Sequence, residues 1–78
     1  MDLPSALQLL ARDPNLVAWR GRGVIIRMTE GHVIERVFIP RPHRWAAPYK
    51  DIVAMDWLAG TPADLEKFYA RMQQENAA

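Results

Sequence analysis

Glycine and proline interrupt this chain at short intervals, and these interruptions limit every helix and strand to a modest length. Glycine admits left-handed backbone, and proline removes a backbone donor, so neither continues a regular element well. The interruptions fall at Pro14, Gly21, Gly23, Gly31, Pro40, Pro42, Pro48 and Gly60. We therefore expect a single domain, residues 1–78, made of short elements joined by tight turns.

Helical patterns occupy both ends of the chain. Apolar residues recur at helical spacing near the N-terminus and predict a helix over about 3–11 that ends before Pro14. Thr61 is a good N-cap and Asp64 completes a capping-box-like pattern, so a last helix is expected over about 62–74. Its apolar face contains Leu65, Phe68, Tyr69 and Met72. Residues Gln73–Ala78, beyond this face, should fray.

The middle of the chain is rich in β-branched and apolar residues. It predicts short strands over about 16–19, 24–29 and 32–39, and a final short strand near Trp57. The segment Pro40–Arg44 should be an extended loop outside the sheet, because prolines two residues apart prevent regular pairing.

The turn at Glu30–Gly31 leaves two registers open. A two-residue loop pairs Ile26 with Glu35, whereas a three-residue loop pairs Ile26 with Ile34 and separates apolar from charged side chains more cleanly, so we favour the second. A short helix over about 48–55 follows the proline-rich loop. The expected fold is α+β, with an antiparallel sheet of three to five short strands and three helices.

Charge is distributed unevenly along the chain. Between Pro14 and Lys50 there are seven basic residues and two acidic ones, while the rest of the chain has three basic residues and seven acidic ones. Arginine dominates the basic residues, and its planar guanidinium suits phosphate or carboxylate. This pattern favours a small anionic ligand. The net charge of +1 argues against nucleic acid held through its phosphate backbone.

Residues that carry catalysis or hold metals are scarce. The absence of cysteine removes disulfides and thiolate chemistry, and two scattered histidines, His32 and His43, do not make a zinc site. Ser5 has no histidine nearby in sequence that could act as its base, so it is not a candidate catalytic nucleophile. Asp51 and Asp56 are five positions apart, which on a helix separates them by about 140° and argues against a shared acid–base role. We expect Asp56 to bond nearby backbone or an arginine, and we predict no enzyme activity, cofactor or metal.

The size of the chain bears on its assembly and location. A domain this small buries a modest fraction of its surface, and without disulfides or a metal the remaining stabilising device is a partner subunit. A homodimer or homotetramer is therefore expected. Apolar runs of four or five residues are too short to span a membrane, and the N-terminus lacks a basic export signal, so we expect a cytoplasmic protein.

Two stretches are the best candidates for ligand binding. In Trp19-Arg20-Gly21-Arg22-Gly23 the two glycines allow positive φ, and successive amides in such a turn can form an anion-binding nest. The competing interpretation is a hairpin loop with solvated arginines. Trp45 lies in a loop, where it either stacks on a nucleobase, worth about 1–3 kcal/mol, or covers one end of the sheet.

Both stretches resemble a known family of small phage and prophage proteins. Trp19–Gly23 looks like the Trp-Asn-Gly-Lys-Gly run after that family's first helix, and Trp45–Trp57 is similar to its Trp-x-Pro/Ala-Ser-x-x-Asp-Leu-Leu-Ala-x-Asp-Trp signature. The family includes the type-two Thoeris anti-defence proteins, homo-oligomeric sponges that sequester cyclic ADP-ribose-type signals. The resemblance covers roughly Leu3–Leu58. The chain departs from it in having Arg20 in place of asparagine, a shorter middle segment and an added C-terminal helix.

The resemblance implies an anti-defence sponge that binds a cyclic nucleotide signal without degrading it. Arginines and glycine amides would hold the phosphates, Trp45 would stack on the base, and Asp51 would accept a hydrogen bond from a ribose hydroxyl or an adenine amine. Two alternatives stay open. One is a protein-interaction inhibitor of a host defence complex that uses the surface from Arg20 to Arg44. The other is a small nucleic-acid-binding protein.

Overall fold

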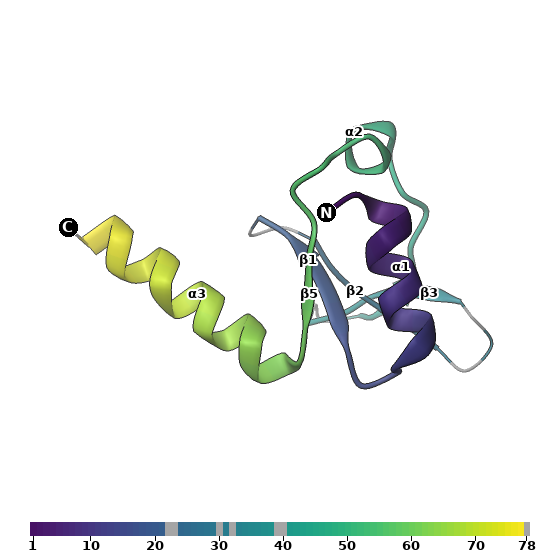
Figure 1. The fold of residues 1–78 in the computed structure, drawn as a ribbon, viewed down its shortest axis with the longest axis horizontal. Coiled ribbons are helices and arrows are strands. Elements are labelled where there is room, and N and C mark those ends of the chain that lie inside the picture. The colour runs from purple at the N-terminus through teal and green to yellow at the C-terminus, as the bar shows by residue number, and fades with distance from the viewer. Residues whose placement is uncertain (22–23, 30, 32, 39–40, 78) are drawn as a thin grey trace.

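The computed structural model describes residues 1–21, 24–29, 31, 33–38 and 41–77. They form the predicted α+β fold, in which helices flank a five-stranded antiparallel sheet (Figure 1). In chain order the elements are α1 (Leu3–Arg12), β1 (Val17–Arg20), β2 (Val24–Met28), β3 (Ile34–Arg36), β4 (His43–Arg44), α2 (Tyr49–Ile52), β5 (Leu58–Gly60) and α3 (Pro62–Ala77). No helix in this described part is long and apolar enough to cross a membrane.

The sheet has the strand order β4-β3-β2-β1-β5, and every neighbouring pair is antiparallel. Both registers expected for the β2–β3 turn are wrong, because Ile26 pairs with Arg36. The turn instead closes on Thr29, whose backbone N–H donates to the Val33 carbonyl at 2.9 Å and whose Oγ1 accepts from the Val33 N–H at 3.2 Å. This register also sets Arg27 opposite Glu35, a cross-strand ion pair.

Two predictions about the proline-rich region are wrong. The third strand is Ile34–Arg36, much shorter than 32–39, and Phe38 beyond it has a left-handed backbone with φ of 59°. His43–Arg44 is a strand, not an unpaired loop, and it pairs with β3. Pro42 lies just before the paired residues, so its missing N–H removes no hydrogen bond from the edge of the sheet.

The helices differ from their predicted lengths for local reasons. α2 is shorter than 48–55, because the Asp51 carbonyl accepts a hydrogen bond of 2.9 Å from the Trp57 indole instead of continuing a helical ladder. α3 extends beyond 62–74 and includes the residues expected to fray, as far as Ala77. α1 matches its prediction to within one residue at Arg12.

The core has two parts, one on each face of the sheet, since alternate strand residues point to opposite sides. The α1 face packs against β1, β2 and the segment before β5, with the buried residues Leu3, Ala6, Leu10, Ala18, Ile26 and Trp57. The other face packs against the first turns of α3 through Val17, Trp19 and Leu65. The rest of α3 projects away from the sheet (Figure 1).

Candidate functional site

Arg20, the first arginine of the predicted binding loop, is held by two carboxylates. Its Nη1 donates to Asp51 Oδ1 at 2.9 Å, and its Nε donates to Asp56 Oδ1 at 2.7 Å. The hydrogen bond with Asp56 is the main cause that raises the pKa of Arg20, and the same bond lowers the pKa of Asp56. The prediction that Asp56 bonds an arginine is confirmed. A phosphate at Arg20 would have to compete with both carboxylates.

Asp51 is built into the fold. Its side chain is almost completely buried, and its backbone carbonyl accepts from the indole Nε1 of Trp57 at 2.9 Å. Trp57 is itself fully buried, and the half-buried ring of Trp45 packs edge-on against it at 5.9 Å between ring centroids. The stretch from Trp45 to Trp57 therefore folds on itself, and the Asp51 carboxylate that was expected to receive a ligand is engaged by Arg20.

The predicted site residues do not all come together. Arg20, Trp45 and Asp51 belong to the α1 face of the sheet. Trp19 points to the opposite face, where it is 4% exposed and its ring lies 5.8 Å from that of Phe68. Gly21 has φ of 58°, the left-handed conformation that the two glycines were expected to allow. Arg22 and Gly23 lie outside the described residues.

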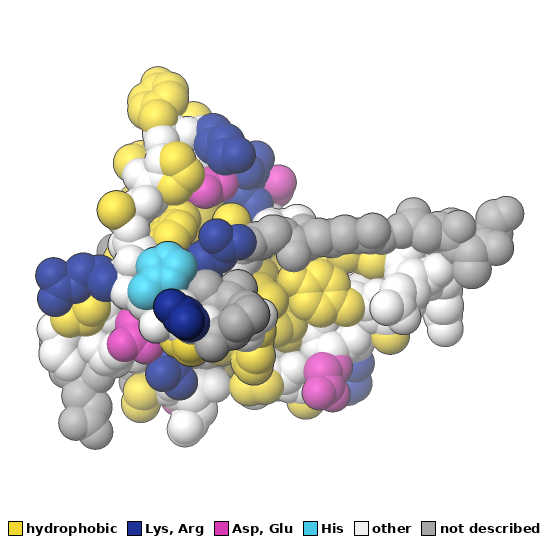
Figure 2. Space-filling model, turned by 180° about the vertical axis from the view of Figure 1, so that it is seen from behind, with side chains coloured by type: hydrophobic (Ala, Val, Ile, Leu, Met, Phe, Trp, Pro, Cys, Tyr) yellow, Lys and Arg dark blue, Asp and Glu magenta, His cyan; other side chains and the backbone are white. Residues whose placement is uncertain are grey.

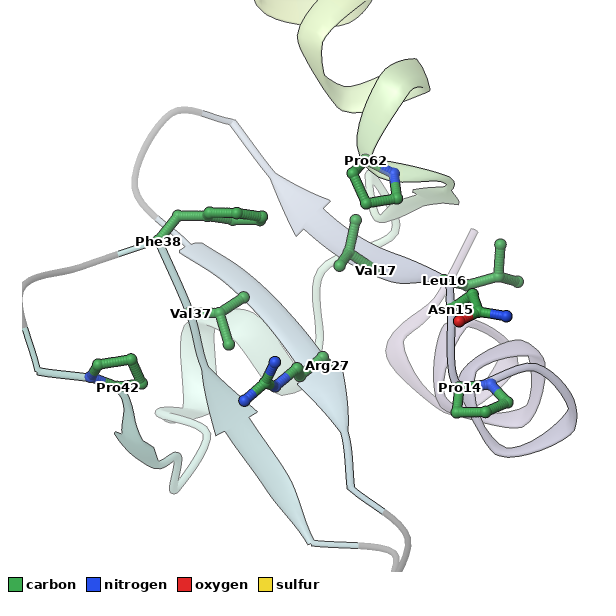
Figure 3. Close-up of a pocket in the computed structure, with 9 residues that line it drawn as sticks. All are labelled: Pro14, Asn15, Leu16, Val17, Arg27, Val37, Phe38, Pro42 and Pro62. Carbon is green, nitrogen blue, oxygen red and sulfur yellow. The ribbon is translucent and has the colours of Figure 1, made fainter.

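A concave surface lies on the face of the sheet opposite α1. It is a hollow of about 420 Å³ between the end of β3, the start of β1 and the beginning of α3 (Figure 3). Phe38 stands on one side and Pro14 on the other, with Val37 and Arg27 between them (Figure 3). Its lining consists of Pro14, Asn15, Leu16, Val17, Arg27, Val37, Phe38, Pro42 and Pro62.

Two side chains give this hollow chemical character. Phe38 is 63% exposed and has a left-handed backbone, a conformation that is strained for a bulky residue and that concentrates at functional sites. Arg27 donates Nη2 and Nε to Glu35 Oε2, at 3.1 and 3.3 Å, and its Nη1 has no hydrogen-bond partner among the described residues. An aromatic ring and a guanidinium therefore face the same space.

A second hollow of about 240 Å³ lies under α3 and shares Phe38 and Pro62 with the first. The rest of its lining is Ile25, Leu65, Glu66 and Tyr69. Burial raises the pKa of Tyr69. The buried atoms Tyr69 Oη and Trp19 Nε1, both in this packing layer, have no hydrogen-bond partner among the described residues.

The described residues contain no group of three histidine, aspartate or glutamate side chains placed to hold a metal ion. Sequence reasoning missed Phe38 as a site residue because it treated 32–39 as one regular strand. Arg27 was counted only among the basic residues in the middle of the chain and was not predicted to be a site residue. The signal that would have singled out Phe38 is its place between a strand and two prolines, where the sheet cannot cover it.

No protein-family model, curated protein or solved structure matches this chain.

Proposed function

We propose that this protein binds a small anionic ligand without converting it, and that it serves as an anti-defence sponge for a cyclic ADP-ribose-type or cyclic nucleotide signal in the host cytoplasm. One observation carries the proposal. The exposed ring of Phe38 and the guanidinium of Arg27 face one hollow whose remaining lining is mostly apolar (Figure 3). A nucleotide offers a flat ring and a phosphate, which match these two groups.

The size and chemistry of the hollow fit this ligand class. Its volume of about 420 Å³ falls within the range of roughly 300–1,000 Å³ typical of small-molecule sites. Stacking of a base on an aromatic side chain contributes about 1–3 kcal/mol, and guanidinium is the side chain best matched to phosphate. Because Arg27 also bonds Glu35, a bound phosphate would share the guanidinium with a carboxylate.

The α1 face offers a second position for the same ligand, with Trp45 as the stacking group. Trp45 is half-buried against Trp57, and the nearby Arg20 is already bonded to Asp51 and Asp56. A phosphate that binds Arg20 would first have to break the hydrogen bonds between Arg20 and the two carboxylates. Exchanging these charge-assisted hydrogen bonds lowers the net binding energy of the phosphate. The hollow beside Phe38 is therefore the position we favour.

The test is calorimetry and thermal shift with a panel of cyclic ADP-ribose isomers and cyclic dinucleotides. We expect one ligand class to bind and to be recovered chemically intact after heating releases it. Arg27→Gln and Phe38→Ser should each weaken binding about tenfold, whereas Arg71→Gln, on the exposed surface of α3, should not. Degradation of the ligand, or no binding across the panel, would refute the proposal. Loss of binding in Trp45→Ala alone would move the site to the α1 face.

A further inference from the structure

A row of three charged side chains crosses the sheet beside the hollow. Arg27 on β2 lies directly opposite Glu35 on β3, and Glu35 lies directly opposite Arg44 on β4. Residues that face one another across antiparallel strands point to the same side of the sheet. Because Arg27 is part of the lining of the hollow, all three side chains stand on the face that carries it. We call these residues the Arg27–Glu35–Arg44 row.

The packing of the sheet agrees with this placement. Ile26, next to Arg27 in β2, is buried in the core on the α1 side. Side chains alternate along a strand, so Arg27 points away from α1. Val37, two residues beyond Glu35, points to the same side as Glu35 and lines the hollow (Figure 3). The row therefore borders the hollow along the middle of the sheet.

Arg44 is the uncommitted member of the row. Its side chain is exposed, and it forms no hydrogen bond or ion pair with any residue that the structure describes. Pro42, two residues before it, lines the hollow. Neighbouring strands are about 4.8 Å apart, so the Cα atoms of Arg27 and Arg44, with β3 between them, are about 10 Å apart. Two long arginine side chains that start at this spacing can reach one ligand from opposite sides.

The row has a local excess of positive charge. It contains two cations and one anion, so its net charge is about +1. On the face drawn in Figure 2, basic and acidic side chains lie beside one another over the body of the molecule. Binding of an anion therefore depends on which cations are not already engaged by a carboxylate. Arg27 donates two of its nitrogens to Glu35, whereas all the donors of Arg44 are available to a ligand.

We propose that Arg44 is a second phosphate-binding residue and that the ligand of the hollow carries a diphosphate. This assignment rests on the proposed function, because it extends the site beside Phe38. The base stacks on Phe38, the first phosphate binds Arg27, and the second binds Arg44 on the far side of Glu35. Guanidinium binds phosphate through paired, charge-assisted hydrogen bonds, so each arginine can hold one phosphate. The Glu35 carboxylate repels both phosphates, which makes binding depend on both cations.

Two nucleotides that differ by one phosphate, AMP and ADP, test this assignment by calorimetry. The wild type should bind ADP about tenfold more tightly than AMP. Arg44→Gln should lose most of this preference and bind AMP within about twofold of the wild type, whereas Arg27→Gln should weaken both nucleotides. Arg12→Gln removes the same charge from the exposed end of α1, on the other side of the sheet, and should change neither affinity.

Glu35→Gln should have the opposite effect from the arginine variants. Removing the carboxylate releases Arg27 and removes the repulsion of the phosphates, so ADP should bind about threefold more tightly or better. A residue that served only to stabilise the sheet would not raise the affinity for a ligand when it is replaced. Circular dichroism verifies that every variant is folded.

Inorganic phosphate and pyrophosphate separate this inference from the proposed function, because they have no base. In titrations followed by NMR of the backbone amides, the wild type should prefer pyrophosphate, with the largest shifts in β3 and β4, and Arg44→Gln should abolish the preference. If this result holds while no nucleotide binds, the proposed function fails and the diphosphate site stands. The site is overturned if the wild type binds neither ADP nor pyrophosphate. It is also overturned if folded Arg44→Gln keeps the wild-type affinity for both, or weakens AMP and ADP equally.

Discussion

Arg20 and Asp51 lie 31 positions apart in the chain and form a hydrogen bond of 2.9 Å between Nη1 and Oδ1. This contact joins the end of β1 to the middle of α2. Asp51 is buried, so its charge is acceptable in the fold only because the guanidinium compensates it. The same contact engages the guanidinium that was predicted to hold a phosphate.

Removing the Asp51 carboxylate should destabilise the fold. In Asp51→Ala the Arg20 guanidinium loses its buried partner and a charge-assisted hydrogen bond, which costs about 2 kcal/mol. Asp56→Ala should cost less, because Asp56 is 65% exposed and water replaces its carboxylate. Urea unfolding followed by circular dichroism measures both changes. Equal losses in the two variants would show that burial of Asp51 does not decide the stability of this cluster.

The two buried indole N–H groups should respond differently to replacement by phenylalanine. Trp57 Nε1 donates to the Asp51 carbonyl, whereas Trp19 Nε1 has no partner among the described residues. Trp57→Phe leaves a buried carbonyl unsatisfied and Trp19→Phe removes an unsatisfied donor, so Trp57→Phe should be the more destabilising by about 1 kcal/mol or more. Thermal unfolding of the two variants compares them directly. A larger loss for Trp19→Phe would contradict this account.

The helices were predictable because their signals are local. Asp2 accepts a hydrogen bond from the Ser5 N–H at 2.9 Å, and Thr61 and Asp64 bond one another reciprocally at the start of α3. The β2–β3 register was not predictable from apolar alternation alone. In the observed register Thr29 Oγ1 accepts from the Val33 N–H and Arg27 lies opposite Glu35, contacts that the apolar pattern does not indicate.

The candidate site was predictable only in part, because its contacts join distant segments. The sequence identified Arg20 and Asp51 as polar residues of interest, and nothing local indicates that they bind each other. Phe38 reaches the hollow only because β3 ends early at Arg36 and the backbone turns left-handed two residues later.

Gly60 is required for the close approach of Asp64 at the start of α3. A Cβ added at Gly60 would lie 2.8 Å from Asp64 Oδ2 and 3.0 Å from Asp64 Cβ, so the capping side chain would have to move. Gly60→Ala should therefore lower the free energy of unfolding by about 1–3 kcal/mol. Gly31→Ala is the matched control, because a Cβ there meets nothing within 4 Å. Chemical denaturation of both variants provides the comparison, and a neutral Gly60→Ala would rule out this steric role.

The stability of the fold should fall in acid. The pKa of Asp64 is lowered by its hydrogen bonds from the Thr61 backbone and hydroxyl, and that of Asp56 by Arg20. A carboxyl whose pKa is lower in the folded state stabilises the fold above its unfolded pKa, about 3.9, and this contribution is lost as the pH falls through the folded value. Urea midpoints should therefore be level between about pH 7 and 5 and decrease steadily below about pH 4.

Asp64→Asn tests which carboxyl is responsible for part of this acid loss. The variant has no charge to titrate at the start of α3, so its urea midpoint should be lower than that of the wild type at pH 7 and should approach it in acid. Glu66→Gln, one turn into the same helix and exposed, controls for the general loss of a negative charge and should run parallel to the wild type. If the Asp64→Asn and wild-type midpoints stay the same distance apart at every pH, the Thr61–Asp64 bonds do not depend on ionisation. The acid sensitivity of the fold would then have to come from the Arg20–Asp56 pair and from the N-terminal cap at Asp2, whose pKa is lowered by its hydrogen bonds with Ser5.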